Sequence, residues 1–196
     1  MGNFYTNVTL LGPDQDSIAE YVAEQNRNAY VSPTVNNFTV VYDEQCESQD
    51  TDILEELASE LSKRFSCPAL AVLNHDDDIL WYKLFEAGQL TDEYDSCPDY
   101  FEAEAELSMP KGGDAGKLCS VFKSEQNVTE VERILRAPNP DAYTFAYERH
   151  EDLARALGIP TFSVGCGYNY ILQDELPEGL EFESLKQTGE PGTNID

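Results

Sequence analysis

The chain has 196 residues, of which 38 are acidic and 12 basic, so its formal net charge is −26 at pH 7 with histidine neutral. A charge of this size repels nucleic-acid phosphates and anionic lipid headgroups, which argues against nucleic acid and membrane surfaces as partners. Acids outnumber bases on both sides of Cys97, so the acidity belongs to the whole chain. Two explanations stay open: the charge keeps the protein soluble, or it recognises a basic protein partner.

Other features of the composition indicate a cytoplasmic protein. No apolar run approaches the roughly 20 residues of a membrane-spanning helix, and the segment Met1–Thr6 lacks the basic and apolar stretches of a secretion signal. The five cysteines include no Cys-x-x-Cys pair and are odd in number, which argues against a disulfide framework or a zinc ribbon. Glycine-rich phosphate-binding loops are missing, and we expect no cofactor.

Residues 1–97 alternate between predicted strands and helices. The clearest helix covers 51–66, where the apolar residues at 53, 54, 57, 58, 61 and 65 form one stripe. Pro33 suggests that the second strand lies at a sheet edge. The predicted order is strand 4–11, helix 13–26, strand 29–34, strand 38–42, helix 51–66, strand 69–73 and a hairpin over 78–94. An α+β fold with a ferredoxin-like, split β-α-β first half and an appended hairpin follows from this order.

The second half has a different pattern. Residues 98–113 are rich in Glu, Pro and Gly and indicate a linker or crossover. Residues 114–196 predict a helical and hairpin half packed on the sheet. Its expected elements are helices near 114–122, 129–137 and 149–157, a strand over 143–147, a hairpin over 161–172 and a tail after 178 that is loose at its end. Because the first-half strands carry apolar residues on both faces, we expect one cooperative unit.

Three parts of the sequence have to be taken together: the start Met1–Leu10, a tract made of Leu73–Tyr82 and Glu93–Ser96, and a second tract, Glu148–Pro160. In these parts the chain resembles a family of uncharacterised bacterial proteins. The resemblance covers most of the chain. It implies a bacterial cytosolic source, and it brings no activity, cofactor or catalytic residue.

The run from His75 to Asp78 offers an imidazole and carboxylates that suit a divalent cation, with His75, Asp76 and Asp78 as the candidate ligands. Neighbouring residues in sequence cannot all converge on one ion, however, and no EF-hand spacing follows. A solvated hairpin turn explains the same run, because Asn and Asp favour turns.

His150 and Cys166 are the candidate catalytic residues. His150 stands among acids at the start of a predicted helix, where it could act as a general base, or form part of an exposed first turn. Cys166 lies between two glycines, where a thiolate could be exposed on a tight turn, or the glycines could simply permit a bend. An acidic environment would raise the pKa of the thiol, which disfavours a nucleophile.

Aromatic residues gather in sequence around the predicted hairpin, with Trp81, Tyr82, Tyr94 and Tyr100 as candidates for a partner-binding face. Alternation along the strand puts Trp81 and Tyr82 on opposite faces, so one of them is a candidate for exposure. Exposed aromatics surrounded by acids would form a protein-binding surface. The alternative is a sheet that is covered on both faces.

We therefore predict a non-enzymatic acidic protein that binds a basic protein partner. A small metal-dependent enzyme using His75, Asp76 and Asp78, or a thiol enzyme using Cys166 and His150, is the first alternative. A small-molecule binding domain is the second.

Overall fold

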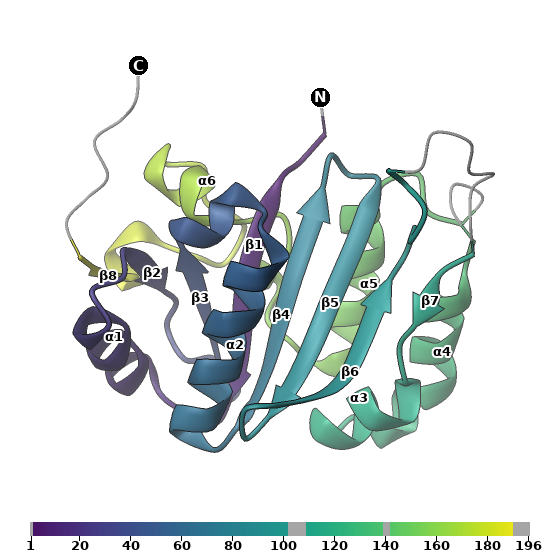
Figure 1. Cartoon of the computed structure of the whole chain (residues 1–196), viewed down its shortest axis with the longest axis horizontal. Helices are drawn as coiled ribbons and strands as arrows, with labels where there is room; N and C mark the ends of the chain where they lie inside the picture. The colour runs from purple at the N-terminus through teal and green to yellow at the C-terminus, as the bar shows by residue number, and fades with distance from the viewer. Residues whose placement is uncertain (1, 102–108, 139–141, 190–196) are drawn as a thin grey trace.

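The computed structural model describes residues 2–101, 109–138 and 142–189, which form one antiparallel sheet with helices on both faces (Figure 1). The strands of the described ranges are β1 (Tyr5–Leu11), β2 (Ala29–Val31), β3 (Phe38–Asp43), β4 (Pro68–His75), β5 (Ile79–Glu86), β6 (Gln89–Asp95), β7 (Lys111–Gly112) and β8 (Lys186–Thr188). The α-helices there are α1 (Gln15–Glu24), α2 (Thr51–Phe65), α3 (Ala115–Val121), α4 (Val128–Arg136), α5 (Ala146–Leu157) and α6 (Tyr168–Leu172). The predicted α+β class is confirmed. Among the described helices none is both long and apolar enough to cross a membrane.

The strand order across the sheet is β7-β6-β5-β4-β1-β3-β2-β8. β5 and β6 form the predicted hairpin and extend the sheet beyond β4, with Tyr82 opposite Tyr94. The edge position predicted for the second strand is wrong, because β8 pairs with β2 through Tyr30 and Gln187. Pro33 falls just beyond the end of β2, so it does not interrupt the hydrogen bonding of this strand.

The first face of the sheet is covered by α1 and α2. The apolar stripe of α2, which includes Leu54, Leu57 and Leu61, packs with Ile18 of α1 over side chains of β1 and β4. Asp14 and Asp50 cap the two helices by accepting hydrogen bonds from backbone N–H groups of their first turns. The predicted stripe therefore forms the core on this side.

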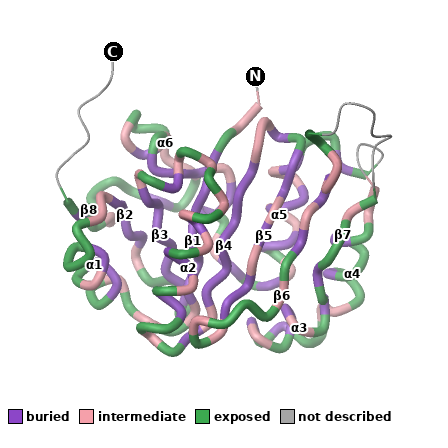
Figure 2. The backbone as a smooth tube through the Cα atoms, in the orientation of Figure 1, coloured by how far each residue is buried: buried purple, intermediate pink, exposed green. Residues whose placement is uncertain are grey.

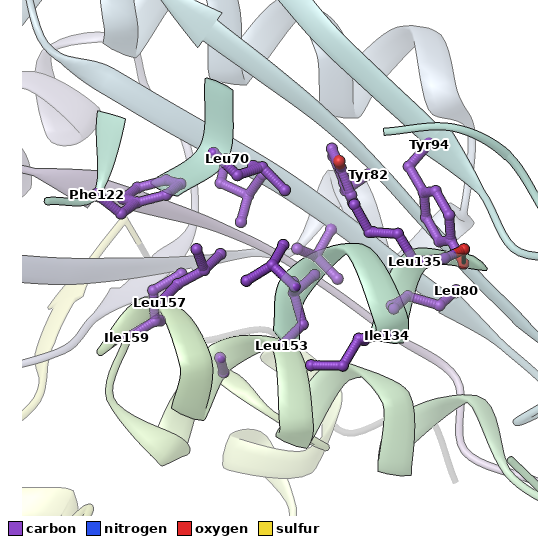
Figure 3. Packing of buried hydrophobic residues seen from close by; sticks show 14 of the residues in the cluster. Leu70, Leu80, Tyr82, Tyr94, Phe122, Ile134, Leu135, Leu153, Leu157 and Ile159 are labelled. Atoms are coloured by element: carbon purple, nitrogen blue, oxygen red, sulfur yellow. Dashed lines mark hydrogen bonds between the residues drawn. The ribbon is translucent and has the colours of Figure 1, made fainter. Parts of the chain in front are cut away.

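The opposite face is covered by elements of the second half. Leu118 of α3, Leu135 of α4 and Leu153 of α5 pack on Leu70 and Tyr82 (Figure 3). A neighbouring cluster places α6 and residues around it against β2 and β3. The buried strands between the two helical layers form the centre of the molecule (Figure 2).

Two predicted elements of the second half are wrong. The segment 161–172 is not a hairpin but a 3-10 helix, Thr161–Ser163, followed by α6. Glu47 accepts the Tyr168 backbone N–H at the start of α6, so a helical turn replaces the expected strand. The strand predicted over 143–147 is replaced by the beginning of α5, where the Glu148 carboxylate accepts the Phe145 N–H.

Parts of the predicted linker or crossover and of the predicted tail take part in the sheet. Lys111 and Gly112 of the expected linker form β7 beside β6, whereas 102–108 lie outside the described residues. Residues 186–188 of the predicted tail form β8, and 190–196, at the end expected to be loose, lie outside the described residues. Backbone pairing with an existing edge needs no apolar pattern in the added strand, which explains why these strands were missed.

All five cysteines are buried free thiols, Cys46, Cys67, Cys97, Cys119 and Cys166.

Leu153→Ala should test whether the halves unfold together, because Leu153 is a buried residue of the second half that packs on first-half strands. Loss of a buried leucine side chain costs about 2–5 kcal/mol of unfolding free energy. For one cooperative unit, Trp81 fluorescence, which reports on the first half, and far-UV circular dichroism should show the same lowered midpoint. The exposed Leu90→Ala serves as the control, with a change of no more than about 0.5 kcal/mol. A Trp81 transition left at its wild-type midpoint would contradict the single-unit prediction.

Candidate functional site

A pocket of about 420 Å³ opens at the end of the sheet where β4 turns into β5, and we call it the acidic pocket. Its lining includes Asn3, Asp76, Asp77, Asp78, Phe145 and Tyr147. The N-terminal segment, the β4–β5 turn and the start of α5 meet here, although they are far apart in the sequence (Figure 1).

The turn is held by hydrogen bonds from two distant segments. Asp76 accepts the Gly2 backbone N–H at 2.9 Å, and Asp77 accepts the Asn3 N–H at 2.9 Å. The Ala146 N–H donates to the Asp77 carbonyl oxygen, which ties the start of α5 to the turn. Asp76 and Asp77 have left-handed backbone conformations, with φ of 51° and 58°, which aspartate tolerates better than most residues. A Cβ atom at Gly2 would overlap the Asp76 carbonyl, so this approach needs glycine.

Exposed aromatic rings flank the turn on both sides. Phe145, which is 45% exposed, stacks on Tyr147 with a centroid distance of 6.0 Å. On the other side lies an aromatic cluster of His75 and three rings that contact its imidazole edge-on, Phe4, Tyr100 and Phe101. Phe101 is 77% exposed, which is unusual for phenylalanine.

The aromatic cluster is joined to the acidic turn by the Tyr100 hydroxyl, which donates to Asp78 at 2.8 Å. This hydrogen bond raises the pKa of Tyr100 to about 12, so the hydroxyl remains a donor at neutral pH. Carboxylates beside aromatic faces suit a cation, since the carboxylates attract its charge and accept hydrogen bonds and the rings add cation–π attraction. The arrangement fits a lysine or arginine side chain.

The three predicted metal ligands have separate partners. His75 Nδ1 lies 2.5 Å from Gln49 Oε1, whereas Asp76 and Asp78 accept from Gly2 and Tyr100. Across the described ranges, no group of three or more His, Cys, Asp or Glu side chains is arranged to hold a metal ion. The structure brings these residues to one turn without making them a ligand set.

The predicted catalytic residues are both buried. His150 is not on an exposed first turn, because α5 begins four residues earlier and carries it beneath the sheet. Its Nδ1 lies 2.8 Å from the Tyr5 hydroxyl, and burial lowers its pKa to about 3, so the ring is neutral. Burial and then the nearby Glu47 raise the pKa of Cys166 to about 12. A neutral thiol at physiological pH is a poor nucleophile.

The four predicted partner-binding aromatics are divided between the core and the surface. Tyr82 and Tyr94 are buried and stacked on each other in the core beneath α4. Trp81 lies half-buried on the opposite face, and Tyr100 is exposed beside the acidic pocket. Sequence reasoning missed Phe145, which is exposed because of where α5 begins on the folded sheet and not because of its neighbours in sequence.

Comparison with protein-family models, with curated proteins and with solved structures found no match for this chain. The residues of the site therefore have to be interpreted from their own geometry.

The two buried groups His150 and Glu47 should have opposite effects on how the stability of the protein changes with pH. The pKa of His150 falls from an ordinary value near 6.5 to about 3, so its contribution is present above pH 6.5 and is lost as the pH falls. Burial raises the pKa of Glu47 from 4.5 to about 7, so its contribution is present below pH 4.5 and is lost as the pH rises. Between about pH 6.5 and 4.5 the two contributions oppose each other.

Single variants should separate the two contributions. Relative to wild type, the unfolding free energy of His150→Asn should rise by about 1.4 kcal/mol for each pH unit of acidification between pH 6.5 and 4.5. That of Glu47→Gln should fall by a similar amount, because this variant keeps the opposing histidine. Urea unfolding across the pH range measures both slopes. Parallel pH profiles of wild type and either variant would contradict the assignment for that residue.

Proposed function

We propose that the protein is a non-enzymatic interaction protein that binds a basic protein partner, and that its acidic pocket receives a lysine or arginine side chain of that partner. The observation that carries the proposal is that Asp76, Asp77 and Asp78 line one pocket with Phe145 and Tyr147. The exposed Tyr100 ring is hydrogen-bonded to the same turn through Asp78. An acidic surface also speeds the encounter with a basic partner.

The rigidity of the turn supports this proposal. Asp77 is buried, and its carboxylate accepts from both the Asn3 N–H and the Asn74 side-chain amide. Asp76 and Asp78 are more accessible, and each accepts from a neutral donor. A binding group whose orientation is already set loses less conformational entropy when the partner arrives.

The enzymatic alternative has less support. His150 and Cys166 are buried, and in the described part of the chain no hydrogen bond joins the thiol to the imidazole. His75, Asp76 and Asp78 point to separate partners. A reaction centre would need groups that converge on one point.

We propose further that residues 1–97 have the ferredoxin-like, split β-α-β arrangement. The strand order β4-β1-β3-β2, with α1 and α2 packed on one face, supports this assignment. The fold does not specify a function, since it supports many kinds of site. A bacterial, cytoplasmic source also remains a proposal, supported by the sequence resemblance.

Asp76→Asn with Asp78→Asn tests the proposed function, because each asparagine keeps one acceptor oxygen and the double substitution removes two charges. The probe is a fluorescent peptide that alternates lysine or arginine with glycine, measured by anisotropy at several salt concentrations. We expect wild type to bind it with an affinity that falls as salt rises, and the double variant to bind at least about tenfold more weakly.

Glu20→Gln with Glu24→Gln is the matched control, since it removes the same charge from the exposed side of α1. This control should bind within about twofold of wild type. Equal losses in both double variants would show that net charge alone attracts the peptide, and the acidic pocket would not be the site.

A further inference from the structure

A second pocket, of about 330 Å³, lies on the face of the sheet that carries α2, beside that helix and over β5, β6 and β7. Its lining includes Trp81, Lys83, Glu93, Asp95, Pro98 and Lys111. The pocket reaches the lower end of the usual range for small-ligand sites, roughly 300–1,000 Å³. We call it the tryptophan pocket, because it holds the one tryptophan of the chain.

The strand register places the charged side chains of the tryptophan pocket in two rows across neighbouring strands. Trp81 is opposite Asp95, which is opposite Lys111, and Lys83 is opposite Glu93 in the next row. Lys83 Nζ lies 5.4 Å from the Trp81 ring centroid, 2.5 Å from Glu55 Oε1 on α2 and 3.8 Å from Glu93 Oε2. Two lysines and two carboxylates therefore line the pocket, and their formal charges cancel.

The balance of charges restricts the kind of ligand. An anion is repelled by the −26 charge of the chain, and a cation would meet the ammonium groups of Lys83 and Lys111. An uncharged ligand avoids both costs. Because the pocket offers ammonium donors and carboxylate acceptors side by side, the best match is a ligand whose polar groups both donate and accept, as hydroxyls do.

We infer that the tryptophan pocket binds an uncharged saccharide ring. The C–H face of the ring would lie against the Trp81 indole, and its hydroxyls would donate to Glu93 and Asp95 and accept from Lys111. Lys83 is held by Glu55 and Glu93, so it also fixes the carboxylate that a hydroxyl would meet. This site is separate from the acidic pocket and does not depend on the proposed partner.

The intrinsic fluorescence of Trp81 tests the inference, since no other tryptophan contributes. The probes are glucose, galactose, N-acetylglucosamine, maltose and cellobiose, each titrated into the full chain, with free N-acetyltryptophanamide to correct for optical effects. We expect a saturable change in Trp81 emission with at least one of these saccharides, and calorimetry at the same concentrations should give a matching affinity.

The double substitution Glu93→Gln with Lys111→Gln should weaken the binding of that saccharide at least about tenfold, because it removes the charge from one acceptor and one donor of the pocket. Glu125→Gln with Lys123→Gln, two exposed residues of the opposite side, is the matched control and should bind like wild type. The Asp76→Asn, Asp78→Asn variant should also bind the saccharide like wild type, which separates this result from the proposed function.

No saturable change with any of the saccharides, confirmed by calorimetry, would overturn the inference. A response to adenosine or uridine at lower concentration than to every saccharide would also overturn it, since a base edge has fixed donors and acceptors. Saccharide binding that survives the Glu93 and Lys111 substitutions unchanged would place the ligand elsewhere.

Discussion

The central sheet carries apolar side chains on both faces, and the need to cover both faces arranges the rest of the chain. In β1, Val8 and Leu10 pack with α1 and α2, whereas Tyr5 belongs to the opposite core. The helices of the first half lie on one face, so the other face would meet water without the second half. The C-terminal elements therefore complete the core, and each half depends on the other for its buried surface.

This dependence also forms the acidic pocket. To pack on the sheet, α5 must begin near the end of β4, where the Asp77 carbonyl accepts the Ala146 N–H. The same turn accepts the N–H groups of Gly2 and Asn3 through its carboxylates. Three distant segments thus meet because the sheet has to be covered, and the exposed Phe145 reaches the turn as a consequence of where the helix starts.

Patterns of local origin were predictable, and patterns that depend on distant partners were not. The stripe of α2 and the hairpin of β5 and β6 follow from residue spacing, and both are found. β8 and α6 depend on what they pack against, since β8 completes the edge at β2 and Glu47 caps α6 from far away in sequence. Of the site, the acidic turn and Tyr100 were predictable. Phe145 was not, because its exposure depends on how α5 docks.

The carboxylates of the acidic pocket differ from many other acids of the chain in what they are paired with. Many bases of the chain are committed to ion pairs inside it, as in Arg27 with Asp43, Arg133 with Glu130 and Arg155 with Glu151. Asp76 and Asp78 are held instead by neutral donors, and within the described ranges no lysine or arginine forms an ion pair with either of them.

Neutral donors orient a carboxylate and leave its charge uncompensated, whereas an ion pair cancels it. A cation that enters the acidic pocket therefore displaces no internal lysine or arginine, and its attraction is not reduced by breaking an existing pair. In the tryptophan pocket, by contrast, Lys83 forms ion pairs with two carboxylates, those of Glu55 and Glu93. The acidic pocket and the tryptophan pocket therefore differ in the partners of their carboxylates. Neutral donors hold the carboxylates of the first, and lysine side chains lie beside those of the second.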